Sequence, residues 1–149
     1  MTDTPTRFYQ AFSRLDHATM ATCYSPGARF VDPVFDVSGD DIGAMWKSLC
    51  EAATDLEITF DVVDFNDSAA LVDWEAVYTF PPTGRTVHNR IQARMSIIEG
   101  LIVEHTDVFD FYKWARQAFG PAGVLIGWAP PFKKRVRERA VRGIHRTSR

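Results

Sequence analysis

A chain of 149 residues, 46% hydrophobic and 24% charged, suits one globular domain that can bury a core without disulfide bonds. Its net charge of −2 conceals an acidic body and a basic end: residues 1–131 hold 9 Lys/Arg and 18 Asp/Glu, whereas residues 132–149 hold 8 Lys/Arg and one acid. An acidic body repels polyanions, so we expect no nucleic-acid partner, and no apolar run approaches the ~18 residues of a membrane span.

The N-terminus, cysteines and histidines predict a cytoplasmic protein without a cofactor. Residues 1–12 lack the apolar stretch of a secretory signal. Cys23 and Cys50 lie in predicted helices without CxxC spacing, which indicates core residues rather than a disulfide or zinc pair. The four histidines fall on different faces or elements, and no glycine-rich phosphate loop is present, so we expect neither a metal nor another cofactor.

Three helices are predicted before residue 55. The first begins at Thr4-Pro5, a cap followed by proline at the first helical position. Asp16 caps a short second helix, and Ser25-Pro26-Gly27 is expected to end it before a strand over Ala28–Asp32. Gly39 precedes the third helix. Its apolar stripe consists of Ile42, Met45, Trp46, Leu49 and Ala53.

The hydrophobic period then changes from 3.6 to 2, which predicts four long strands over about residues 56–65, 69–80, 86–98 and 101–111. Short turns join them in an antiparallel meander, and a fourth helix is predicted from about Tyr112 to Phe119, ending at Gly120. Helices first and strands second indicate an α+β fold, in which a curved antiparallel sheet wraps over the N-terminal helices.

Alternation along the strands identifies the residues that face the helices. Most are aliphatic or aromatic, but Asn89, His105 and Asp107 are polar, and Asp107 can set the tautomer of His105. The three either satisfy one another in a closed network or converge on a ligand cavity. The inward-facing sets are Leu56, Ile58, Phe60 and Val62; Val72, Trp74, Ala76, Tyr78 and Phe80; Val87, Asn89, Ile91, Ala93, Met95 and Ile97; and Leu101, Val103, His105, Asp107 and Phe109.

Asp32 ends a predicted strand, between apolar residues and Pro33, where it is a candidate general base. An acid removed from water resists ionisation, and its pKa rises toward the range of proton transfer. The alternative is structural, because an Asp before a Pro also begins turns by bonding its own backbone. The sequence leaves both interpretations open.

Two features are expected after the sheet. Residues 121–132 are apolar and contain glycine and proline, which predicts a lid over the open end of the sheet with Trp128 as its plug. Apolar residues then recur every four positions among Arg and Lys, which predicts a basic amphipathic helix. That helix can dock on the acidic body or on a second subunit, contact an anionic membrane weakly, or form a frayed terminus. We therefore divide the chain into a domain over 1–120 and a lid with its helix over 121–149.

Several motifs of this chain carry a resemblance to a known superfamily. They are Phe8-Tyr9-Gln10-Ala11-Phe12 with Asp16 and Met20, Cys23-Tyr24, Phe30-Val31-Asp32-Pro33, Gly39 with Met45-Trp46, and Glu99-Gly100-Leu101-Ile102 through His105, Asp107, Phe109 and Asp110. With this order of elements, residues from about 7 to 115 resemble the nuclear transport factor 2-like superfamily. Its cone-shaped, cystatin-like fold is shared by ketosteroid isomerase, SnoaL-type polyketide cyclases and limonene epoxide hydrolase.

The resemblance implies roles for two acids. Asp32 falls where ketosteroid isomerase keeps its general base, and Asp107 falls near an acid on the last strand of limonene epoxide hydrolase and of SnoaL-like cyclases. Phe8 and Ala93 stand where ketosteroid isomerase has the donors that stabilise its oxyanion. The resemblance also implies a homodimer that forms through the outer face of the sheet.

Three functions are compatible with these residues. The first is a cofactor-free isomerase or cyclase that moves a proton next to a carbonyl in a hydrophobic substrate, with Asp32 as base, Asp107 and His105 as a second acid/base pair, and Asn89 or Tyr78 as hydrogen-bond donor. The second is a non-catalytic module that binds a hydrophobic small molecule or pairs with a second copy. The third is an epoxide hydrolase, although its Arg-x-Asp pairing is not on the inner face here. The expected ligand-binding residues are Phe8, Phe12, Trp46, Trp74, Tyr78, Phe109 and Trp128.

Overall fold

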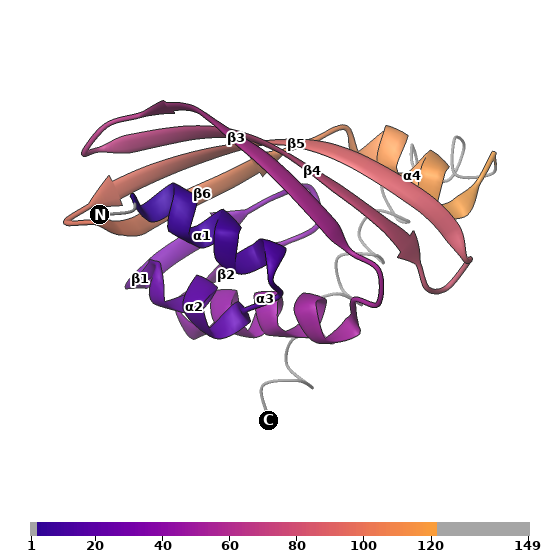
Figure 1. Cartoon of the computed structure of the whole chain (residues 1–149), viewed down its shortest axis with the longest axis horizontal. Helices are drawn as coiled ribbons and strands as arrows, with labels where there is room; N and C mark the ends of the chain where they lie inside the picture. The colour runs from indigo at the N-terminus through magenta and orange to yellow at the C-terminus, as the bar shows by residue number, and fades with distance from the viewer. Residues whose placement is uncertain (1–2, 122–149) are drawn as a thin grey trace.

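The computed structural model describes residues 3–121, which form a curved, open six-stranded sheet with helices against one face (Figure 1). The elements are α1 (Thr4–Ser13), α2 (His17–Thr22), β1 (Tyr24–Val31), β2 (Asp36–Ser38), α3 (Asp40–Ala52), β3 (Glu57–Phe65), β4 (Ala69–Phe80), β5 (Arg85–Ile98), β6 (Leu101–Val108) and α4 (Phe111–Phe119). The predicted α+β fold, a curved sheet over helices, is confirmed. The predicted lid with Trp128 and the basic helix lie outside the described residues.

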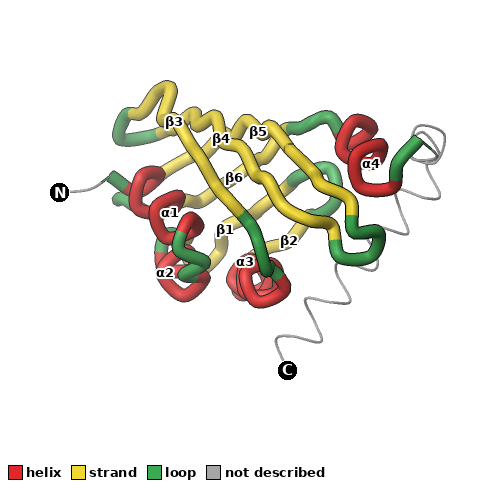
Figure 2. The backbone as a smooth tube through the Cα atoms, turned by 45° about the vertical axis from the view of Figure 1, so that its right-hand side comes forward, coloured by secondary structure: helices red, strands yellow, loops and turns green. Residues whose placement is uncertain are grey.

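The strands follow the order β2-β1-β6-β5-β4-β3, and β1 and β6 are the one parallel pair in this sheet of the described chain. Helices α1, α2 and α3 lie on one side of the sheet, and α4 lies at the end away from α1 (Figure 2). No helix within residues 3–121 is both long and apolar enough to cross a membrane.

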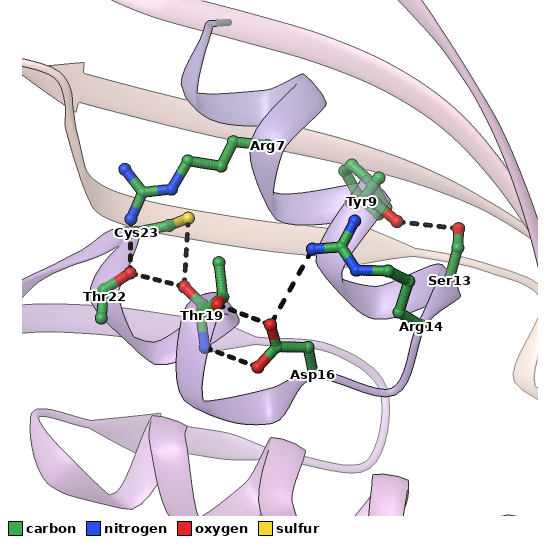
Figure 3. A network of polar contacts seen from close by, with 8 residues as sticks. All are labelled: Arg7, Tyr9, Ser13, Arg14, Asp16, Thr19, Thr22 and Cys23. Atoms are coloured by element: carbon green, nitrogen blue, oxygen red, sulfur yellow. Dashed lines mark hydrogen bonds and ion pairs between the residues drawn. The ribbon is translucent and has the colours of Figure 1, made fainter.

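The start of the chain is capped one residue earlier than predicted. The Asp3 carboxylate accepts a hydrogen bond from the Thr6 backbone N–H at 2.8 Å, so Asp3 and not Thr4 is the N-cap of α1. The Thr4 hydroxyl instead donates to the carbonyl of Gly100 at 2.6 Å. The predicted cap of α2 is confirmed, because Asp16 accepts from both the backbone N–H and the hydroxyl of Thr19 (Figure 3).

Strand β1 begins at Tyr24 and therefore includes Ser25-Pro26-Gly27, which was expected to lie before the strand. In this part of β1 the pairing with β6 shifts register, between Tyr24 and Arg29. A proline is tolerated at such an irregularity because the ladder is already interrupted there. The short strand β2 was not predicted; it pairs with β1, and the Arg29 guanidinium binds the Asp36 carboxylate across the two strands.

The predicted inner faces of β3, β4 and β5 are confirmed, whereas that of β6 is confirmed only from His105 onward. Ile102 is fully buried, and Leu101 and Val103 are partly exposed. The cause is a register shift in the β5–β6 pair between Ser96 and Ile97, because one extra residue reverses the alternation of side chains beyond it.

The buried stripe of α3 differs from the prediction in two positions, Leu49 and Ala53, of which Ala53 lies just after the helix and is only half-buried. Ile42, Met45, Trp46 and Cys50 are buried, but Leu49 is 38% exposed, so its assignment to the core is wrong. Helix α4 begins at its cap Asp110, ends at Gly120 as predicted, and forms a small second core with β5.

Candidate functional site

A cavity of about 540 Å³ lies between the concave face of the sheet and the helices α3 and α4. Its walls are mainly apolar, and its polar groups include Asp32, Asn89, Asp107 and the phenol of Tyr78. The aromatic lining residues are Phe12, Phe35, Trp46, Trp74, Tyr78, Phe80, Phe109, Trp114 and Phe119. An apolar cavity with a few polar groups is the usual form of a small-molecule site.

Asp32 follows β1 directly and forms the predicted turn. One carboxylate oxygen, Oδ1, accepts the backbone N–H of Val34 at 2.7 Å and that of Phe35 at 2.6 Å. These bonds hold the carboxyl group in place at the cavity wall. The same carboxyl group therefore forms the predicted turn and also lies at the cavity wall, where a general base would stand.

The environment of Asp32 favours its protonated form. Burial raises its pKa to about 6, and the negative charge of Asp107 adds to this rise, whereas the two backbone N–H groups and any positive charge on His105 oppose it. Val31 pairs with Thr106 in the parallel β1–β6 ladder, so the next residues along the two strands, Asp32 and Asp107, are neighbours. The pKa of Asp32 thus lies near neutrality, where a carboxylate can both accept and return a proton.

This raised pKa predicts a pH dependence of stability. Because Asp32 has a higher pKa in the folded than in the unfolded chain, the folded state binds more protons between about pH 4 and pH 6, and stability falls as the pH rises through that window. The loss is on the order of 3 kcal/mol for a shift of this size. Urea unfolding of Asp32→Asn between pH 4 and pH 6 should show no such decrease in the free energy of unfolding.

Asp16→Asn is the control for that experiment, since hydrogen bonds from Thr19 lower the pKa of Asp16. Its contribution has the opposite sign: stability is present above the unfolded pKa and is lost as the pH falls. Parallel stability curves for the wild type and Asp32→Asn between pH 4 and pH 6 would contradict the raised pKa.

Asp107 belongs to a buried chain of hydrogen bonds that joins helix α3 to the strands β1, β6 and β4. The Trp46 indole donates to the Tyr24 hydroxyl at 3.1 Å, and that hydroxyl lies 2.7 Å from His105 Nδ1. On its other side, His105 Nε2 lies 2.8 Å from Asp107 Oδ1, which also accepts from the Trp74 indole at 3.4 Å. All five side chains are at most 9% exposed.

One assignment of protons satisfies every group in this chain. The Tyr24 oxygen accepts from Trp46, and its own proton finds an acceptor only if His105 Nδ1 is unprotonated. Nε2 then carries the imidazole proton and donates it to Asp107. A second proton on Nδ1 would leave the buried Tyr24 hydroxyl without an acceptor among the described residues. The network thus specifies a neutral His105.

Removing the Tyr24 hydroxyl should therefore be costly. Tyr24→Phe leaves both the Trp46 indole and His105 Nδ1 unsatisfied in the core, which should lower the free energy of unfolding by about 1–3 kcal/mol. Nitrogen NMR of the imidazole should show a proton on Nε2 in the wild type and a mixture of tautomers in the variant.

Tyr9→Phe is the matched control. The Tyr9 ring is fully buried against Phe60 and Trp74, and its hydroxyl has no hydrogen-bond partner among residues 3–121. Loss of an unsatisfied hydroxyl should leave stability unchanged or raise it slightly. Equal destabilisation by the two substitutions would show that the network contributes nothing specific.

The structure brings together most of the predicted site residues but not all of them. Asp32, Asp107 and Asn89 line the cavity, whereas His105 is sealed behind Asp107 and does not. Phe8 is 0% exposed, does not line the cavity, and packs edge-on against Tyr24, Trp46 and His105. The other predicted wall residues within the described chain do line it: Phe12, Trp46, Trp74, Tyr78 and Phe109.

Sequence reasoning missed part of the site. Trp114 and Phe119 of α4 line the cavity, and the Trp114 indole donates to the Tyr78 hydroxyl at 2.8 Å. The strongly amphipathic pattern of α4 could have indicated that it covers the end of the sheet. Tyr24 entered the sequence analysis only as part of a family motif, and its role in the network had no sequence signal. Among the described residues, no group of three His, Cys, Asp or Glu side chains could hold a metal ion.

Comparison with known proteins agrees with this architecture. The structure is similar to a candidate polyketide cyclase from a Silicibacter species, with a TM-score of 0.66 and 17% identity over 76% of this chain and 91% of that one. It is also similar to a Catenulispora acidiphila protein of ketosteroid isomerase-like fold, determined with trimethylamine, with a TM-score of 0.68 and 14% identity over 87% of this chain and 100% of that one.

A third similar structure is an epoxide hydrolase of M. tuberculosis that resembles limonene epoxide hydrolase, with a TM-score of 0.62 and 13% identity over 83% of this chain and 92% of that one. At these identities the likeness concerns the fold. No protein of curated function matches the sequence. The model of the SnoaL-like domain family matches residues 6–105, two thirds of the chain, and we conclude that this protein belongs to the SnoaL-like domain family of the nuclear transport factor 2-like superfamily.

Proposed function

We propose that this protein is a cofactor-independent isomerase or cyclase that moves a proton at a carbon next to a carbonyl group in a hydrophobic substrate. One observation carries the proposal: the carboxyl group of Asp32 is held by two backbone N–H groups at the wall of an apolar cavity, with its pKa raised to about 6. A base of this pKa works near neutral pH.

The proposed step needs three groups. The Asp32 carboxylate takes the proton from the carbon, and the electron pair of the C–H bond forms an enolate. The phenol of Tyr78 and the amide of Asn89, neighbours on the concave face of β4 and β5, are the proposed donors to the enolate oxygen. The protonated Asp32 then returns the proton to another carbon, so that no external acid or cofactor is consumed.

The other polar residues support this step indirectly. Asp107 does not need to transfer a proton, because its negative charge already helps to keep Asp32 basic. His105 cannot touch the substrate, since it is 1% exposed and both its ring nitrogens have partners. We therefore regard His105 as a positioning residue for Asp107, rather than as a member of a second acid/base pair.

A specific observation also keeps the non-catalytic alternative open. Phe8 and Ala93, which the family resemblance places at the positions of oxyanion donors, are fully buried apolar residues. This favours a binding module if Tyr78 and Asn89 do not supply the missing hydrogen bonds. The epoxide hydrolase receives less support, because Arg90 and Arg94 point away from the cavity and Arg90 pairs with Glu75 on the outer face.

A ligand screen tests the proposal. Thermal shift with steroids, aromatic polyketides and terpene epoxides should identify a stabilising compound, and deuterium exchange from solvent into that compound should reveal proton transfer at carbon. Binding without exchange would favour the binding module. Hydrolysis of an epoxide would favour the third alternative.

A homodimer through the outer face of the sheet is a further proposal. That face carries exposed Val63, Ile98 and Val108 beside charged side chains. Light scattering should give twice the mass of the chain, and Val108→Asp should shift the protein toward monomer, because a charge would be buried at the contact. A monomer at micromolar concentration in the wild type would contradict the dimer.

A further inference from the structure

Asp107 is a buried acid whose partners carry no positive charge. It is 3% exposed, and its Oδ1 accepts from the imidazole N–H of His105 and the indole N–H of Trp74. The proton assignment above makes both donors neutral, because the hydroxyl of Tyr24 donates to His105 Nδ1. Buried acids are almost always paired with a cation, so we expect a cation beside the Asp107 carboxylate.

The protein supplies no such cation within the described part of the cavity. None of the described lining residues is Lys, Arg or His, whereas Asp32, Asp55 and Asp107 are acids. The charge of Asp107 also disfavours a second negative charge beside it, as its effect on Asp32 indicates. An enolate formed in this cavity would meet the same repulsion, unless a positive charge on the substrate offset it.

The walls of the cavity that Asp107 lines suit an organic cation. Trp46, Trp74 and Trp114 supply indole rings, and Tyr78 and Phe109 add two more aromatic rings. The faces of such rings attract ammonium groups, most strongly in tryptophan and in sites that exclude water. An inorganic cation is a poor match, because the described residues offer no cluster of ligands for it.

We infer that the ligand of this cavity carries an ammonium group, held by the Asp107 carboxylate and the surrounding aromatic rings, beside an apolar body. The inference names the substrate class of the site and rests on the proposed function for the claim that this ligand is also turned over. It follows from the contacts of Asp107, whereas catalysis was argued from Asp32. The two claims can therefore fail separately.

Two probes of the same shape test the inference. Benzyltrimethylammonium and neopentylbenzene differ mainly in the replacement of a quaternary nitrogen by carbon. Their binding to the full chain can be followed by tryptophan fluorescence, because three indole rings line the cavity. We expect the ammonium probe to bind at least tenfold more tightly, and the phenylacetate anion to bind more weakly than both.

Substitutions then locate the source of this preference. Asp107→Asn should remove most of it, whereas Asp61→Asn should leave it unchanged, because it removes the same charge from the exposed outer face. Equal affinity for the two probes, binding of neither at millimolar concentration, or an undiminished preference in Asp107→Asn would overturn the inference. If Asp107→Asn does not fold, the wild type alone can decide: the inference is overturned if phenylacetate binds as tightly as the ammonium probe.

The outcome for the proposed function is measured independently. Asp32→Asn should abolish proton exchange while the preference for the ammonium probe remains. Loss of exchange with a retained preference therefore supports both claims. Exchange by the wild type without any preference for the cation would overturn the inference and leave the proposed function intact.

Discussion

Asp32→Asn is expected to lower kcat by about 10²–10⁴-fold on whichever carbonyl compound the wild type turns over, because it removes the general base and keeps its shape. In the wild type, kcat/KM should rise with pH and level off above about 6, since the base must be ionised to act. Steady-state kinetics or solvent-deuterium exchange at several pH values measures both effects. The affinity for the substrate should change much less than kcat.

Asp36→Asn is the matched control for this substitution. Asp36 lies on β2, four residues from Asp32, and its carboxylate binds Arg29 at the exposed surface. Its loss should leave kcat and the pH profile unchanged. A fully active Asp32→Asn variant, or a wild-type profile that is flat between pH 5 and pH 7, would remove Asp32 from the mechanism.

Phe8→Ala is expected to cost about 3–5 kcal/mol of unfolding free energy, the range for a large aromatic residue removed from a packed core. The Phe8 ring is fully buried and makes edge contacts with Tyr9, Phe12, Tyr24 and Trp46, and with the imidazole of His105. Urea unfolding with a shared m-value measures the loss.

Phe109→Ala provides the comparison, because Phe109 lines the cavity and is partly exposed. It should lose less stability than Phe8→Ala and more affinity for an apolar ligand. Phe8→Leu should recover much of the lost stability, since it refills most of the volume. A loss under about 1 kcal/mol in Phe8→Ala would mean that the core closes around the missing ring.

Local patterns predicted the elements well, for a definite reason. Side-chain periodicity differs between helix and strand, and it identifies which face of each element points inward. This sufficed to place Asn89, His105 and Asp107 on one inward-facing surface of the sheet. The exception in β6 arose because a bulge reverses the alternation, and a single extra residue in a pair of strands leaves little trace in the sequence of either.

Periodicity does not reveal which inward-facing residues pack in the core and which line a cavity. Phe8 and Leu49 exemplify the difference: the first was expected to line a pocket and lies in the packed core, and the second was expected in the core and borders the cavity. The spacing between a sheet and its helices depends on contacts between residues far apart in the chain. Only the tertiary structure specifies it.

By itself, the sequence determined the α+β class, the family and the inward-facing positions of Asn89 and Asp107, because each depends on local pattern or on a short motif. The tertiary structure decided that His105 is sealed by Tyr24 and Trp46 while Asp107 reaches the cavity. The hydrogen bond between Tyr24 and His105 depends on how strands and helices pack. The number of residues that separate the two in the chain does not indicate how close they lie in the fold.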